Sequence, residues 1–131
     1  MEERSAEAVV RAIYDAWRQG YAPRHLIAEE LEYVNPSDAV ETGTRHGRSA
    51  LAAPFEAYEE FDITPDRYVP VGADRVVVIA KVHIRARESG VEIDTHQGYV
   101  WTVRDGRAVR FEWFRHPADA LAAVDVEDGA G

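Results

Sequence analysis

The sequence contains no cysteine, which excludes disulfide bridges, thiol nucleophiles and cysteine-ligated zinc sites. No apolar run approaches the roughly 20 residues that a membrane helix needs, so we expect no membrane partner. Residues 1–4 lack the basic flank and apolar stretch of a signal peptide. Together these absences lead us to expect a cytoplasmic protein.

Basic residues are scarce, with 15 Lys and Arg against 24 Asp and Glu and a formal net charge of −9 at pH 7. A phosphate backbone would be repelled, and the basic residues form no stripe, so we expect no nucleic-acid partner. Glycine-rich phosphate loops and nucleophile elbows are absent from the sequence as well. We therefore expect no cofactor.

The composition is that of an ordinary globular chain, with 131 residues, 46% hydrophobic and 30% charged. This length predicts a single domain over residues 1–131. Its last residues, 125–131, are acidic and glycine-rich, and we expect this tail to fray.

The first half of the chain has helical periodicity. A helix is expected between the N-cap Ser5 and Gly20. Its apolar stripe is Val9, Val10, Ile13, Tyr14 and Trp17. Pro23 opens a short turn through Ile27, and residues 31–35 predict a short strand that stops at a proline. A second helix is expected over residues 49–61.

The second half is rich in β-branched and aromatic residues. Strands are expected over 63–71, 75–87, 92–103 and 108–114, with hairpin turns at Ser89-Gly90 and Asp105-Gly106. Pro117 then starts a helix through Ala123. Helices followed by a meander of antiparallel strands predict an α+β fold.

A two-residue turn at Ser89-Gly90 places Arg85 opposite Asp94 and His83 opposite His96. The opposite face of these two strands is more apolar and suits a covering helix. It comprises Ala80, Val82, Ile84, Thr95, Gln97, Tyr99 and Trp101.

The loop length of the next hairpin, between the predicted strands 92–103 and 108–114, decides which side chains extend that apolar face. A three-residue loop over residues 104–106 puts Phe111 and Trp113 beside Tyr99 and Trp101. A two-residue loop would instead turn Arg110 and Glu112 inward. We favour the three-residue loop, and the alternative stays open at this point.

Several stretches of the chain resemble the SnoaL-like branch of the NTF2-like superfamily. They are Val-Val-Arg-Ala-Ile-Tyr-Asp-Ala-Trp, Glu-Tyr-Val-Asn-Pro, Thr-Arg-His-Gly-Arg-Ser-Ala-Leu, Val-Trp-Thr-Val-Arg-Asp-Gly-Arg and Trp-Phe-Arg-His-Pro-Ala-Asp-Ala-Leu. The resemblance covers about residues 6–124 and implies a cone, a curved antiparallel sheet wrapped around the N-terminal helix. It also implies a homodimer that forms through the outer sheet face. The alternative is that this face is simply exposed to solvent. That face would carry Lys81, His83, Arg85, Asp94 and His96.

Ketosteroid isomerase, in the same superfamily, uses a carboxylate base and an oxyanion hole of a tyrosine and a protonated aspartate. By resemblance, Tyr14 corresponds to that tyrosine, Asn35 falls at the base and Tyr99 lies near the protonated acid. An amide takes up no proton at neutral pH, so Asn35 removes the base, while both tyrosines could still donate to a carbonyl oxygen. The alternatives are a core role for Tyr14 and backbone satisfaction for Asn35.

Two related mechanisms and a metal site receive less support. Epoxide hydrolases of this fold use inward Asp and Arg residues, but the predicted inward positions carry no charge. Polyketide cyclases of this branch use an internal aspartate, for which Asp38 and Asp62 are the nearest candidates, although both suit turns. His83 and His96 would offer only two ligands, so we predict no metal.

The aromatic residues suggest a pocket for a small apolar molecule bearing a ring or a carbonyl group. Its predicted ligand-binding residues are Trp17, Tyr33, Phe55, Tyr58, Val82, Ile84, Gln97, Trp101, Phe111 and Trp113. Isomerase, cyclase or lyase chemistry would then involve Tyr14, Asn35 and Tyr99. The competing hypothesis is a non-catalytic dimerisation or partner-binding module whose cavity is plugged by Trp101 and Trp113.

Overall fold

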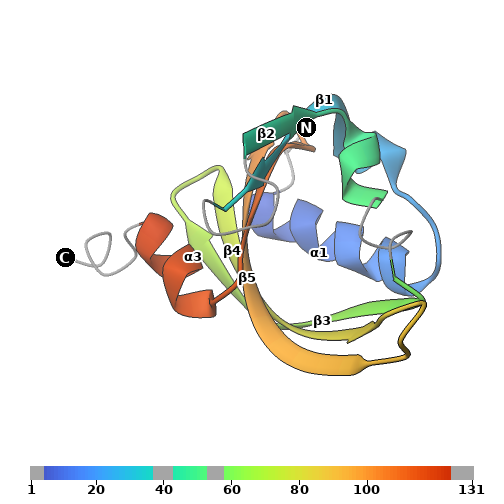
Figure 1. Cartoon of the computed structure of the whole chain (residues 1–131). Coiled ribbons are helices and arrows are strands. Elements are labelled where there is room, and N and C mark those ends of the chain that lie inside the picture. Colours follow the sequence, from blue (N-terminus) through green and yellow to red (C-terminus); the bar gives the residue numbers. More distant parts are fainter. Residues whose placement is uncertain (1–4, 37–42, 53–57, 125–131) are drawn as a thin grey trace.

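The computed structural model describes residues 5–36, 43–52 and 58–124. Within them a long helix, α1, lies inside the curve of a six-stranded sheet (Figure 1). The helices are α1 (Ala6–Arg18), α3 (Pro117–Ala123) and the short 3₁₀ turns η1 (Arg24–Leu26) and η2 (Arg48–Ala52). The strands are β1 (Ile27–Asn35), β2 (Gly43–His46), β3 (Glu60–Val71), β4 (Arg75–Arg85), β5 (Glu92–Arg104) and β6 (Arg107–Phe114). None of the helices in these ranges is long and apolar enough to cross a membrane.

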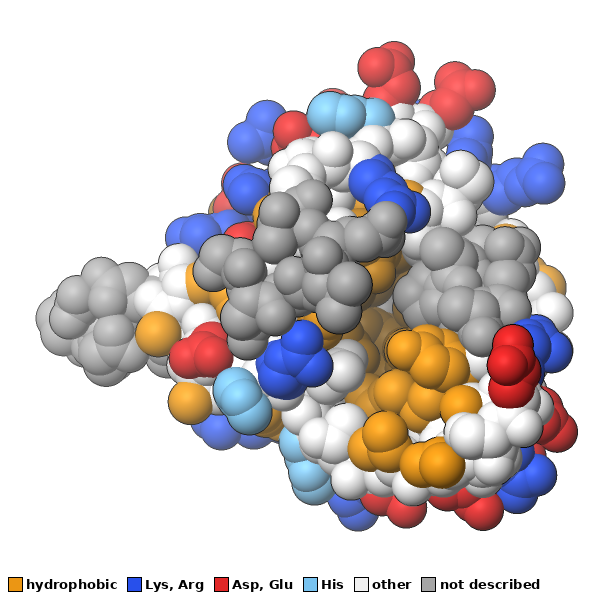
Figure 2. Space-filling model, viewed as in Figure 1, with side chains coloured by type: hydrophobic (Ala, Val, Ile, Leu, Met, Phe, Trp, Pro, Cys, Tyr) orange, Lys and Arg blue, Asp and Glu red, His pale blue; other side chains and the backbone are white. Residues whose placement is uncertain are grey.

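The strand order is β2-β1-β6-β5-β4-β3. Strands β3 to β6 form the expected antiparallel meander, and β1 runs parallel to β6 and antiparallel to β2. The predicted α+β fold, a curved and mostly antiparallel sheet around the N-terminal helix, is therefore confirmed. On the open side of the curve, hydrophobic side chains gather around a depression (Figure 2).

Helix α1 forms as its sequence predicts. The Ser5 hydroxyl accepts a hydrogen bond from the Ala8 N–H at 3.1 Å, which satisfies one of the free amides of the first turn. The apolar stripe turns into the sheet, and Val9, Val10 and Ile13 are fully buried. Burial of this stripe is the main force that holds the helix in the curve.

The hairpin between β4 and β5 is longer than predicted. Its strands pair Arg85 with Glu92 and His83 with Asp94, and residues 86–91 form the connection. The predicted two-residue turn and the pairing of His83 with His96 are therefore wrong. Because the register moves by two residues, every side chain keeps its predicted face.

The hairpin between β5 and β6 has a two-residue turn, so the predicted three-residue loop is also wrong. Asp105 and Gly106 both have positive φ, 53° and 78°, as a type I′ turn requires. Val103 pairs with Ala108 and Thr102 with Arg110, which leaves Val109 as the extra residue of a β-bulge. The shorter turn alone would turn the side chains of β6 to the face opposite to the predicted one. The extra residue of the bulge turns them back.

As a result the predicted inward set is correct: Trp101 pairs with Phe111, and Tyr99 pairs with Trp113. Arg110 and Glu112 lie on the outer-face parity, opposite Thr102 and Val100. The acid and base that an epoxide hydrolase would need are thus not supplied by β6.

The predicted helix over residues 49–61 is wrong at its C-terminal end. A short 3₁₀ turn, η2, covers its start, while β3 begins at Glu60 and pairs Phe61 with Ile84 on β4. Phe55, one of the predicted ligand-binding residues, lies outside the described residues, as do Asp38 and the tail 125–131.

Helix α3 covers part of the outer sheet face, on the side opposite α1 (Figure 1). There Ala120 and Val124 pack against Val77 and Val100 in a second apolar cluster. The close approach depends on Gly98 of β5, because a Cβ at this position would lie 2.5 Å from the Cβ of Ala120. The exposed remainder of the outer face is the polar part predicted from the sequence.

Candidate functional site

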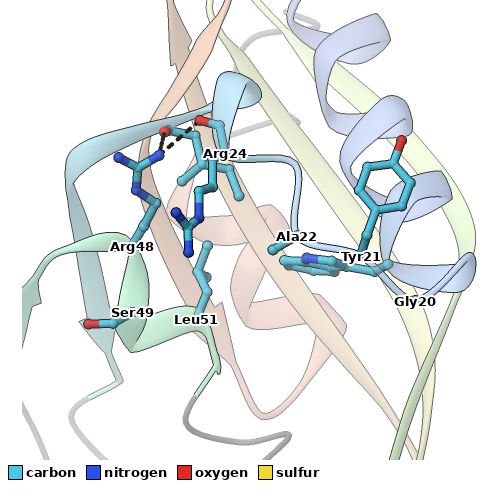
Figure 3. Close-up of a pocket in the computed structure, with 9 residues that line it drawn as sticks. Gly20, Tyr21, Ala22, Arg24, Arg48, Ser49 and Leu51 are labelled. Atoms are coloured by element: carbon cyan, nitrogen blue, oxygen red, sulfur yellow. Dashed lines mark hydrogen bonds between the residues drawn. The ribbon is translucent and has the colours of Figure 1, made fainter.

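A hollow of about 560 Å³ lies where the end of α1 meets η1, β1 and η2 (Figure 3). The side chains and backbone that line it are Trp17, Gly20, Tyr21, Ala22, Arg24, Ile27, Arg48, Ser49 and Leu51. Its volume falls within the range of small-molecule sites, roughly 300–1,000 Å³. The described lining contains two arginines and no carboxylate.

The local sequence builds one wall by ending α1 abruptly. Gly20 adopts a φ of +93°, and its N–H bonds the Trp17 carbonyl at 3.0 Å, so the chain leaves the helix directly after the apolar stripe. Pro23 is buried and precedes η1, which carries Arg24. Trp17, the last residue of the stripe, is left at the edge of the core and faces the hollow.

Arg48 braces the opposite wall. Its Nη1 donates to the carbonyl oxygens of Arg24 at 3.0 Å and Ile27 at 3.4 Å, which joins η2 to η1 and β1 (Figure 3). The preceding residue, Gly47, has a φ of +114° and donates its N–H to the Leu31 carbonyl at 2.8 Å. These three bonds fix η2 beside the first strand.

Tyr14, the first predicted catalytic residue, lies behind the hollow. Its hydroxyl accepts a hydrogen bond from the Trp101 Nε1–H at 3.1 Å, and both side chains are buried. Burial raises the pKa of the Tyr14 hydroxyl well above its usual value, so the group stays protonated. The Trp17 ring packs edge-on against Tyr14 with centroids 5.2 Å apart, so Tyr14 lies one side chain deeper than the hollow.

The other two predicted catalytic residues are held by separate partners. The Tyr99 hydroxyl donates to the Gln97 Oε1 at 2.8 Å, and burial raises the pKa of Tyr99. Asn35 accepts from the Trp113 Nε1–H at 2.8 Å and donates to the Gly43 carbonyl at 3.4 Å. In the part of the chain that the structure describes, no hydrogen bond joins Tyr14, Asn35 and Tyr99 to one another.

Most of the predicted pocket residues fill the cone. Rings of Tyr33, Tyr99 and Trp101 all contact Phe111, with centroid distances of 5.2, 5.3 and 4.7 Å. Burial raises the pKa of Tyr33 to about 12. The remaining predicted residues are buried Val82, partly buried Ile84, Gln97 and Trp113, and Tyr58, which stacks on Phe61. Of the predicted set, Trp17 lines the hollow.

The two arginines were missed by the sequence interpretation. Arg48, Ser49 and Leu51 belong to the stretch Thr-Arg-His-Gly-Arg-Ser-Ala-Leu, which the resemblance singles out, so a signal for them was present. Arg24 follows a proline in a short connection and carries no periodicity that would point inward.

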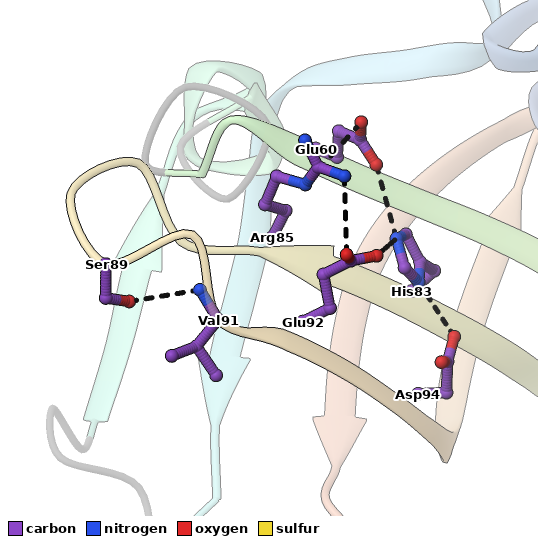
Figure 4. Close-up of polar contacts among 7 residues, drawn as sticks. All are labelled: Glu60, His83, Arg85, Ser89, Val91, Glu92 and Asp94. Carbon is purple, nitrogen blue, oxygen red and sulfur yellow. Dashed lines mark hydrogen bonds and ion pairs between the residues drawn. The ribbon is translucent and has the colours of Figure 1, made fainter.

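The outer sheet face holds a second groove, of about 430 Å³, around His83. The His83 Nδ1 lies 2.7 Å from Asp94, and its Nε2 lies 3.2 Å from Glu60 and 3.3 Å from Glu92 (Figure 4). The hydrogen bond to Asp94 and the nearby carboxylates raise the pKa of His83. No group of three or more His, Asp or Glu side chains in the described ranges could hold a metal ion.

A helix inside a curved, mostly antiparallel sheet is the NTF2-like, cystatin-like architecture. The chain belongs to the SnoaL-like domain family, whose model matches residues 10–111. No curated protein matches it.

Three solved structures illustrate the fold. An NTF2-like protein of unknown function from Burkholderia pseudomallei is 23% identical, with a TM-score of 0.70 over 92% of this chain and 97% of that one. TerC, co-crystallised with polyporic acid, is 21% identical, with a TM-score of 0.69 and coverages of 92% and 98%. IdmH from Streptomyces antibioticus, a candidate polyketide cyclase, is 20% identical, with a TM-score of 0.69 and coverages of 91% and 97%. At these identities the likeness shows the fold alone.

Proposed function

We propose that the protein binds a small apolar molecule, bearing a ring or a carbonyl group, in the hollow at the end of α1. The observation that carries this proposal is the hollow itself, about 560 Å³ in volume, with Trp17, Ile27 and Leu51 among its walls. A few polar groups set among apolar and aromatic walls are typical of small-molecule sites. Trp101 and Trp113 pack in the core inside the curve of the sheet, as the alternative of a plugged module supposes, and the hollow lies apart from them.

The comparisons support the same class of ligand. TerC, which shares the fold, has been crystallised with polyporic acid, and IdmH is a candidate polyketide cyclase. The fold hosts different functions, so they support binding of a small organic molecule rather than one reaction.

We further propose that the bound molecule undergoes isomerase, cyclase or lyase chemistry, in which Tyr14 has the central role. Its protonated hydroxyl already accepts from Trp101 and donates to no acceptor among the described residues, so its own proton is available for a carbonyl oxygen. A ligand in the hollow would reach this proton once the Trp17 ring turns aside. Asn35 and Tyr99 would act through hydrogen bonds, and no carboxylate base is assigned.

The test is to fill the hollow. Ala22 lines the hollow and is exposed, so Ala22→Trp adds bulk there without disturbing the core. Ala73→Trp, in the exposed turn between β3 and β4, is the matched control. Isothermal titration with 2-acetylnaphthalene, a neutral ring-bearing ketone, should show binding to the wild type and the control but not to Ala22→Trp. Equal binding to all three proteins would place the ligand elsewhere.

The alternative function is a dimerisation module that uses the outer sheet face. Two features of this face favour it. They are the ion pairs around His83 and the groove of about 430 Å³. The Asp94 side chain is 81% exposed, so Asp94→Lys tests the face without affecting the core. Native mass spectrometry should then show a dimer for the wild type and weaker association for the variant. A monomeric wild type would remove this proposal.

A further inference from the structure

The hollow is lined by an arginine, Arg24, that has no carboxylate partner among the described residues. Arg11, Arg18, Arg85 and Arg110 each lie beside a carboxylate, Glu7, Asp15, Glu92 and Glu112 respectively. Arg24 has no ion pair and no side-chain hydrogen bond to any residue in 5–36, 43–52 or 58–124. Arg67, Arg75, Arg104 and Arg107 also have no ion pair or side-chain hydrogen bond in these ranges, but none of them lines the hollow.

A second positive charge lies on the same wall. The Arg48 guanidinium binds two backbone carbonyls, which are neutral acceptors, and no carboxylate among the described residues pairs with it. Arg24 and Arg48 lie together at the side of the hollow next to Leu51, and the Tyr21 hydroxyl points away from them (Figure 3). A protein with a net charge of −9 therefore has a hollow whose described lining is positive.

We propose that the ligand of this hollow is an apolar carboxylate, whose anionic group pairs with Arg24 while its ring lies against Trp17 and Leu51. The proposal rests on the binding function proposed above and adds the charge of the ligand. The planar guanidinium of Arg24 offers paired N–H donors that match both oxygens of a carboxylate. Arg48 adds its positive charge to the site. Its hydrogen bond to the Arg24 carbonyl also fixes the backbone that carries the Arg24 side chain.

A pair of probes that differ in charge tests this assignment. Isothermal titration at low salt compares 2-naphthoate with its neutral methyl ester on the wild type and on Arg24→Gln. Hydrogen bonds to charged groups predict that Arg24→Gln binds naphthoate about tenfold more weakly. Binding of the ester should not change. Salt near 0.5 M should weaken naphthoate binding to the wild type and leave ester binding as it was.

Arg104→Gln is the matched control, because it removes the same charge from an exposed position at the end of β5, away from the hollow. It should bind naphthoate as the wild type does. Arg24 is exposed, so its variant should melt at the wild-type temperature.

The outcomes separate the two proposals. Equal affinity of both probes for the wild type, or naphthoate binding that Arg24→Gln leaves unchanged, would overturn the anionic ligand and its pairing with Arg24 while sparing the binding function. If neither probe binds the wild type, the binding function fails and this inference fails with it.

Discussion

Replacing Tyr14 with Phe tests whether this side chain holds the core together. The substitution deletes one oxygen, the acceptor of the Trp101 Nε1–H at 3.1 Å, and keeps the ring in place. Trp101 is fully buried, so its N–H would lose its partner without gaining water. A buried donor left unpaired costs about 1–3 kcal/mol, and we expect the free energy of unfolding to fall by about 2 kcal/mol.

Urea unfolding followed by far-UV circular dichroism measures this change. Tryptophan fluorescence is a poor probe here, because Tyr14 contacts both Trp17 and Trp101. With slopes of about 1–3 kcal/mol per molar urea, the midpoint should drop by about 1 M at an unchanged slope. An altered slope would mean that the native or the unfolded ensemble has changed, and the hydrogen bond could not then be isolated.

Tyr68→Phe is the control for the loss of a tyrosine hydroxyl. Tyr68 also packs on Tyr14 and takes the Arg11 guanidinium over its ring at 4.0 Å, but its hydroxyl bonds no residue in the described part of the chain. We expect its midpoint to stay close to that of the wild type. Equal stability of Tyr14→Phe and Tyr68→Phe would refute the structural role of the Tyr14–Trp101 bond.

Two further predictions concern the outer sheet face. Gly98→Ala places a Cβ 2.5 Å from that of Ala120 and 3.1 Å from the Pro117 Cα, so thermal melts should show a loss of about 1–3 kcal/mol. The loss should shrink in the background of Ala120→Gly, and strict additivity would contradict the contact. Since its carboxylate neighbours, Asp94 first, raise the pKa of His83 above 6.5, its stabilising effect is complete below that pH and is lost as pH rises through the folded pKa. The stability gap between the wild type and His83→Gln should therefore be present at pH 6 and close towards pH 9, and a gap that does not vary with pH would contradict this.

How far the sequence predicts the sheet is clearest at the last hairpin. Alternation along β5 and β6 gives the right inward set, but the predicted loop is one residue too long. The turn at Asp105-Gly106 and the bulge at Val109 each reverse the parity, so together they restore it. Nothing in the residues around Val109 marks a bulge, which is why the correct faces follow from an incorrect loop.

The helix predicted over residues 49–61 failed for a different reason. Leu51, Tyr58 and Phe61 have helical spacing, yet Phe61 is recruited by a strand distant in sequence, opposite Ile84. Strand pairing supplies backbone hydrogen bonds and a covered face that local periodicity does not contain. Strand β2, Gly43–His46, was missed likewise because its partner lies in β1.

For the candidate site, the sequence predicts the face of a residue but not its depth. Tyr33, Trp101 and Phe111 do point inward, but their rings contact one another and occupy the space that a wider cone would leave open. Alternation along a strand does not predict how closely large rings pack against one another in three dimensions. Trp17 lies in the last turn of α1, where the packed interior gives way to the hollow, and its predicted role in ligand binding stays a prediction.

The hollow therefore owes its shape to connections rather than to the sheet. Residues 20–24 and 48–51 supply most of its lining, whereas the buried aromatic cluster belongs to strands and α1. A change at Arg24 or Ser49 alters an exposed side chain, while a change at Trp101 removes a fully buried one and costs folding stability. Under the proposed function, the residues that line the hollow could thus change the ligand preference with little loss of stability, which is a physical reason why one fold carries many different binding sites.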